Sequence, residues 1–157
     1  MSMVWGSDER GFTFFEVLIV MGILVIVGGF ALFVSMETYR GSNFRSDRNL
    51  LVATLQRARA EAMNNICTGT CTDGEPHGVH VQSDAYIIFQ GSSYNANDSN
   101  NAPFDSNTIV TKTPSSLDVV FSQLSGTTTP VMITLSDSAG HVSTTTISSG
   151  GQITWTN

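Results

Sequence analysis

The chain has 157 residues and a formal net charge of −6, and 13% of its residues are charged against 41% that are hydrophobic. This length suits one domain plus an anchoring segment. Five of the seven basic residues lie between Arg40 and Arg59, whereas the section from Cys67 to the C-terminus holds seven acids and one base, Lys112. That distal section lacks a basic stripe, which argues against a non-specific nucleic-acid-binding surface there.

An uncharged, mostly apolar run of 20 residues extends from Val17 to Met36. About 20 helical residues at ~1.5 Å each cover a bilayer core of ~30 Å, so the run predicts a membrane-spanning helix. Glu16 stands directly before it. The position of Glu16 has two interpretations. Its carboxylate reaches toward lipid headgroups, or it pairs with the new α-amine that cleavage after Gly11 would create on Phe12.

The stretch "GFTFFEVLIVMGILVIV" resembles the N-terminal signature of type IV prepilins and type II secretion pseudopilins. The resemblance implies that residues 1–11 are a leader, which prepilin peptidase removes after Gly11. Phe12 would become the N-methylated terminus, and residues 12–36 would form the transmembrane and assembly helix. Glu16 would dock to the amine of a neighbouring subunit during assembly.

The next segment, 37–66, predicts an amphipathic continuation of this helix, which Gly41-Ser42-Asn43 would be able to interrupt. Apolar residues recur at helical spacing along one face. They are Phe44, Leu51, Leu55, Ala58, Ala62 and Ile66. The arginines lie off this stripe, where a solvated helix face is favoured over a phospholipid- or partner-binding patch.

From 67 to 157 the pattern changes to short strands separated by turns. The predicted strands are 78–81, 85–90, 108–112, 117–122, 131–136, 143–148 and 152–156, and the polar segment 91–107 is expected to be an exposed loop. We predict an α+β fold in which the long N-terminal helix packs on a mostly antiparallel β-sheet domain, as in type IV pilins.

The helix end "LLVATLQRARAEAMNN" is similar to that of GspH/FimT-type pseudopilins, with matches at Leu55, Ala58, Arg59, Glu61 and Ala62. Some FimT-like proteins bind DNA through basic residues near the C-terminus. Here the chain ends in "GGQITWTN", without Arg or Lys, so that activity is not carried over.

Cys67 and Cys71 follow the predicted helix closely. A short loop disulfide is the leading interpretation for an extracytoplasmic domain. Free thiols and a zinc site with His77 and His80 are the alternatives, although the spacing is not a strong zinc pattern. The sequence offers no catalytic motif, and we expect no enzyme activity, metal or cofactor.

These features together predict a structural minor pilin or pseudopilin of a type II secretion or type IV pilus-like filament. Its partners would be prepilin peptidase, other subunits and the membrane assembly platform. It would cross the plasma (inner) membrane once, with its C-terminal domain extracytoplasmic, before it enters the pilus or pseudopilus. The alternatives are a DNA-uptake (competence) pilus subunit and a membrane-anchored binding domain or enzyme.

Overall fold

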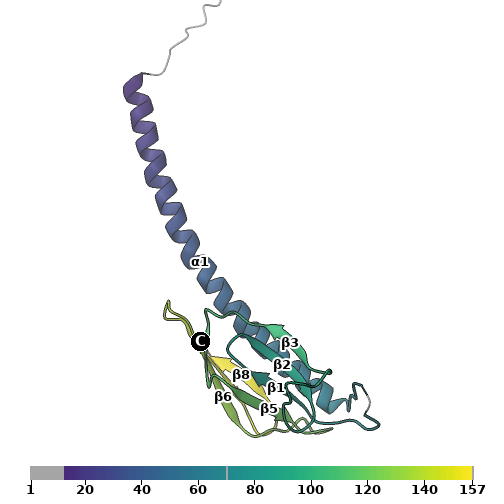
Figure 1. The fold of residues 1–157 in the computed structure, drawn as a ribbon. Helices are drawn as coiled ribbons and strands as arrows, with labels where there is room; N and C mark the ends of the chain where they lie inside the picture. Colours follow the sequence, from purple (N-terminus) through teal and green to yellow (C-terminus); the bar gives the residue numbers. More distant parts are fainter. Residues whose placement is uncertain (1–12, 70, 157) are drawn as a thin grey trace, which may run out of the picture. The chain divides into compact units, whose positions relative to one another are not determined.

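The computed structural model describes residues 13–69 and 71–156, without the side chains of 31–38. Two compact units divide the chain between Tyr39 and Arg40. The elements are α1 (Phe14–Met63), β1 (His77–Val81), β2 (Ala85–Gln90), β3 (Ala102–Asp105), β4 (Thr111–Thr113), β5 (Leu117–Phe121), β6 (Val131–Ser136), β7 (Val142–Ile147) and β8 (Ile153–Thr156) (Figure 1).

The apolar stripe predicted on the second part of the helix is confirmed. Its buried members are Phe44, Leu51, Leu55, Ala58 and Ala62. They pack in one core with residues of both β-sheets. Helix α1 continues through residues 41–43, so the interruption considered there does not occur.

The helix ends three residues earlier than predicted, at Met63, and Ile66 is 40% exposed rather than buried. Asn65 adopts a left-handed φ of 55°. Its backbone N–H donates to the carbonyl of Ala62, and that of Ile66 donates to the carbonyl of Glu61. This is the Schellman pattern, which turns the chain away before Ile66 reaches the core.

The strands form two four-stranded sheets, with orders β3-β2-β1-β5 and β4-β6-β7-β8. Every pairing between neighbouring strands in them is antiparallel. From the sequence we expected the helix to pack on one face of a single sheet. In the structure, residues of both sheets pack with the helix in one core. The α+β fold with a helix packed on antiparallel sheets is confirmed.

Two sequence expectations for the sheets were wrong. The segment 91–107 is not all loop, because 102–105 form edge strand β3, paired with β2. Proline is tolerated on such an edge, and Pro103 lies there. The strand predicted at 108–112 begins only at Thr111, since the side chain of Asn107 accepts a hydrogen bond from the backbone of Ile109 and holds a turn.

Glycines with left-handed backbone conformations stand in the turns between the later strands. Gly126, Gly140 and Gly151 have φ values of 62°, 88° and 74°. These are left-handed conformations that glycine adopts without steric cost. Gly140 and Gly151 lie in the turns that join the paired strands β6, β7 and β8, whereas Gly126 lies in the connection from β5 to the other sheet.

Within the part of the chain that the structure describes, no helix is both long and apolar enough to cross a membrane. Residue 12 and the side chains of 31–38 lie outside this description, so the transmembrane helix over 12–36 stays a prediction.

Candidate functional site

The N-terminus of α1 is the first candidate site. Gly11 and Phe12, the predicted cleavage and methylation residues, lie outside the described residues. The backbone N–H of Glu16 donates to Oγ1 of Thr13 at 3.3 Å, and the N–H of Val17 donates to the Thr13 carbonyl at 3.2 Å. Thr13 is therefore the N-cap of α1.

Thr13 and Glu16 stand at the spacing of a capping box, in which the acid occupies the third helical position. Sequence reasoning gave Thr13 no role, although the T-x-x-E pattern ahead of an apolar run is a known signal for a helix start. Glu16 is exposed and lies in the first turn. The positive end of the helix dipole stabilises its carboxylate there, and the carboxylate remains accessible to an amine.

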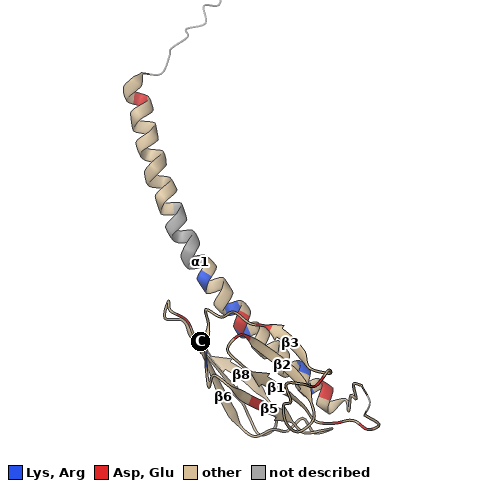
Figure 2. Ribbon diagram, in the orientation of Figure 1, with Lys and Arg blue, Asp and Glu red and all other residues tan. Residues whose placement is uncertain are grey.

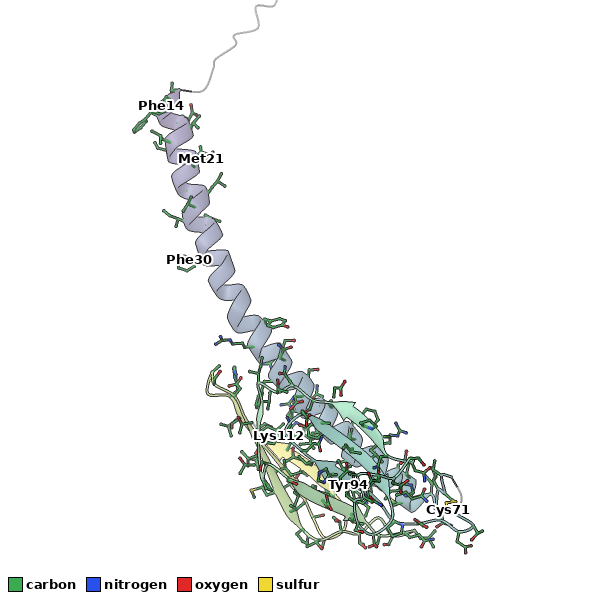
Figure 3. All side chains as sticks on the ribbon, in the orientation of Figure 1. Phe14, Met21, Phe30, Cys71, Tyr94 and Lys112 are labelled. Carbon is green, nitrogen blue, oxygen red and sulfur yellow. A yellow bond between two sulfur atoms is a disulfide. The ribbon has the colours of Figure 1, made fainter. Side chains whose placement is uncertain are left out.

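Apart from Glu16, the surface of α1 from Phe14 to Phe30 is apolar around its whole circumference. Its large side chains range from 46% exposed at Val17 to 82% at Phe14. Figure 2 shows one acid near the start of this stretch and no other charge, and Figure 3 labels Phe14, Met21 and Phe30 along it. A helix that is apolar on every side is normally buried, so this stretch requires an apolar environment outside its own chain.

The second candidate site is the loop after α1, where Cys67 and Cys71 form a disulfide with Cα atoms 5.9 Å apart. The loop is attached to β2 because the backbone N–H of Thr68 donates to Oε1 of Gln90 at 2.7 Å. The amide of Gln90 also donates to Sγ of Cys71 at 3.1 Å. These bonds fix the loop beside the end of β2.

The two histidines of the alternative zinc site face other groups. Nδ1 of His77 contacts the carbonyl of Glu75 at 3.0 Å, and Nδ1 of His80 contacts Oδ1 of Asp118 at 2.5 Å. The ring of Tyr94 stacks on His80, with centroids 4.0 Å apart. No group of three or more potential metal-ligating side chains is found among the described residues.

A buried polar cluster in the domain was missed by sequence reasoning. Asp47, on the core face of α1, accepts hydrogen bonds from the hydroxyl of Tyr86 and the backbone N–H of Asn107, each at 2.9 Å. Nζ of Lys112 lies 3.9 Å from Oδ2 of Asp47. It donates to the carbonyl of Ser83 at 2.8 Å. The cluster joins the helix to one strand from each sheet.

Burial shapes the electrostatics of this cluster. Desolvation lowers the pKa of Lys112, against the opposing attraction of Asp47 and Asp84. Desolvation, with the charge and hydrogen bond of Asp47, raises the pKa of Tyr86. Asp47 sits three residues after Phe44 and four before Leu51, so its place on the stripe was a signal for a buried acid that needs a partner.

Two of the arginines on α1 have structural contacts. Nε of Arg57 lies 2.8 Å from Oε1 of Glu61, and the Arg57 guanidinium lies 5.6 Å from the ring centroid of Phe104. Arg59 donates to the carbonyl of Gly150 at 3.1 Å. These two side chains therefore bind within their own domain.

Residues 6–32 match the family model of the prokaryotic N-terminal methylation motif. No significant match was found among curated proteins or solved structures. The motif implies processing by prepilin peptidase, anchorage in a membrane and later incorporation into a filament with other pilins, and it indicates a structural subunit. The match is confined to residues 6–32, and it supports a type IV pilin-like prepilin.

Proposed function

We propose that the protein is a minor pilin or pseudopilin, of the GspH/FimT type, in a type II secretion or type IV pilus-like filament. The methylation motif at residues 6–32 is the observation that carries this proposal. In this scheme 1–11 are the leader, 12–36 the membrane and assembly helix, 37–66 the amphipathic segment, and 67–157 the extracytoplasmic β-rich domain. The assembly platform then transfers the processed chain from the membrane into the filament.

The exposed apolar side chains of residues 14–30 support a role in packing. Each such side chain is stabilised by roughly 1.5–3 kcal/mol when it leaves water, either for lipid or for the surface of a neighbouring helix. Neighbouring helices in a filament bury such a surface on all sides, as lipid does before assembly. Apolar packing alone does not fix the axial position of one helix relative to its neighbour. A polar contact is therefore needed to set this register.

Glu16 supplies that contact in our proposal. Cleavage after Gly11 creates an α-amine on Phe12, and the carboxylate of Glu16 on an adjacent subunit pairs with it. A charged pair in an apolar surrounding is favourable only when both partners are present, because either charge alone remains uncompensated. The Thr13 cap supports the pairing by fixing the first turn, from which Glu16 projects.

The test is a Glu16→Ala variant, expressed in the full chain with its assembly machinery. We expect normal removal of residues 1–11 and at least a tenfold loss from the sheared filament fraction, since breaking a buried pair costs about 3–5 kcal/mol. Asp105→Ala removes an exposed acid of β3 and serves as the matched control. Normal incorporation of the Glu16 variant would refute the assembly role.

A disulfide between Cys67 and Cys71 in the exported protein is part of the proposal. Closing so small a loop is expected to stabilise the folded domain by about 2 kcal/mol on the chain-entropy account. Thiol labelling of the exported, denatured protein with and without reductant measures it. Labelling of both cysteines before reduction would contradict this assignment.

A further inference from the structure

One end of the domain carries a groove with an unpaired cation. The groove, of about 480 Å³, is lined by Gly41, Phe44, Arg45, Gly140, His141 and Val142. The ring of Phe44 packs on His141, with centroids 5.6 Å apart, and Val142 is 51% exposed. Arg45 is exposed and has no hydrogen-bond or ion-pair partner among the described residues. The groove therefore combines an apolar floor with a free guanidinium.

A hydrogen bond fixes the histidine at the rim of this groove. Nδ1 of His141 lies 2.7 Å from Oδ2 of Asp137, whose side chain is only 4% exposed. The pair orients the imidazole against the ring of Phe44. An incoming carboxylate would meet Arg45, while apolar atoms beside it would contact Phe44 and Val142.

The other end of the domain has the complementary character. Exposed apolar side chains gather around the end of α1: Met63 is 44% exposed, Ile66 40% and Leu124 64%. Leu124 is placed there because its backbone N–H donates to the carbonyl of Ala62. This end therefore presents apolar surface where the helix stops.

Acidic side chains stand beside that apolar surface. A Cβ added to Gly74 would collide with Asn65, so the chain between Asp73 and Glu75 lies directly against the helix end. Asp73 is exposed. Glu75 is half-buried, and Oε2 of Glu75 has a long contact of 3.4 Å with the amide of Gln90. Neither acid has an ion-pair partner among the described residues.

The two ends are too far apart to meet within one molecule. Phe44 and Met63 are separated by roughly 28 Å along the helix, at ~1.5 Å per residue. In Figure 1 the turn between β6 and β7 lies near the start of the helical part of the domain, and in Figure 3 Cys71 marks the opposite end. Contact between these surfaces requires two molecules.

We propose that the Arg45 groove of one chain receives the Asp73–Glu75 end of a second copy. This inference rests on the proposed function as a filament subunit. Two different surfaces of the same chain meet in it, which makes the contact head-to-tail. Arg45 at one end and Asp73 and Glu75 at the other, which have no ion-pair partners among the described residues, favour this orientation over head-to-head or tail-to-tail contacts, which would leave these charges without opposite partners.

The test uses two charge-reversed forms of the full-length chain, purified in a non-ionic detergent. One carries Arg45→Glu, and the other carries Asp73→Arg with Glu75→Arg. Each form alone brings like charges together, so we expect its self-association, measured by sedimentation equilibrium, to weaken about tenfold. Mixed in equal amounts, they restore opposite charges at both junctions, and association should recover to the wild-type level. About 1 M NaCl, where the Debye length is ~3 Å, should weaken the wild-type contact.

The control is Asp105→Arg, which reverses an exposed acid outside both surfaces and should leave association unchanged. Circular dichroism melts confirm that each variant is folded. Wild-type association of either variant alone, or no recovery on mixing of folded variants, overturns the proposal. Capture of a different subunit through Arg45, without self-association, overturns it too. Removal of residues 1–11, read by intact mass after co-expression of the wild-type chain with prepilin peptidase, tests the proposed function separately.

Discussion

At the scale of single residues, the buried cluster of Asp47, Tyr86 and Lys112 specifies how the helix meets the two sheets. Asp47 lies on α1, Tyr86 on β2 and Lys112 on β4, so one carboxylate serves partners from both sheets. Loss of either Tyr86 or Lys112 leaves the buried charge of Asp47 less well compensated. The resulting loss of folding free energy exceeds the net contribution of the hydrogen bond or ion pair itself. The cluster therefore disfavours other packings of the same apolar surfaces.

The first prediction concerns the Tyr86 hydroxyl. Tyr86→Phe keeps the ring in the core but removes a donor from Asp47, and we expect the free energy of unfolding to fall by about 1.5–3 kcal/mol. Urea denaturation measures the loss. Tyr94→Phe is the control, because its ring stacks on His80 and the hydroxyl has no hydrogen bond recorded among the described residues. Equal losses for the two variants would contradict a special role for Tyr86.

The second prediction concerns acid stability. Burial acts to raise the pKa of Asp137, but hydrogen bonds from the side chain and backbone of His141 and from the backbone of Ala139 outweigh it and lower this pKa. A lowered pKa stabilises the folded state above the unfolded value of about 3.9, and this stabilisation is lost as pH falls through the folded value.

Asp137→Asn should therefore lower the melting temperature above about pH 4, and the gap from the wild type should close as the pH falls below that value. Melting curves across this range measure the gap. A gap that stays constant with pH would show that the carboxylate charge of Asp137 does not contribute.

At the scale of the element, α1 has two surfaces with different requirements. Residues 14–30 are exposed on every side, whereas the later part presents one buried stripe to its own domain. The stripe was predictable because the apolar residues of one helix face recur every three to four positions in the sequence. The end of the helix was less so, because Asn65, rather than the more usual glycine, adopts the left-handed cap.

The third prediction concerns the start of this helix. Thr13→Ala removes the N-cap, which contributes about 1 kcal/mol, so the amide of Glu16 should exchange its hydrogen about fivefold faster. Hydrogen exchange of the full chain measures this rate. Thr13→Ser keeps a hydroxyl and should retain most of the protection. Equal exchange in the alanine and serine variants would mean that the hydroxyl does not cap the helix.

The positions of the strands were predictable only where a β-rich segment lay between two turns. The segments at 85–90 and 131–136 were found at their observed bounds. β3 was missed because its four residues lie in a polar segment, and only pairing with β2 makes them a strand. Long-range pairing of this kind overrides local propensity, and it leaves no pattern in the strand itself.

At the scale of the whole molecule, one chain combines a processing motif, an apolar helix surface and a domain with an arginine at one end and acids at the other that have no ion-pair partners among the described residues. The motif and the apolar run were readable from the sequence, because cleavage and burial depend on consecutive residues. The groove at Arg45 was not, since it is made by residues about 100 positions apart that only the fold brings together. The other end also depends on a long-range contact, because the backbone of Leu124 bonds to the carbonyl of Ala62.

The central claim is that cleavage after Gly11 creates the amine that Glu16 needs. Intact-mass analysis of the protein recovered from the filament fraction tests it most directly. We predict a chain that begins at Phe12 and carries one added methyl group. Recovery of an assembled chain that still begins at Met1 would contradict the claim.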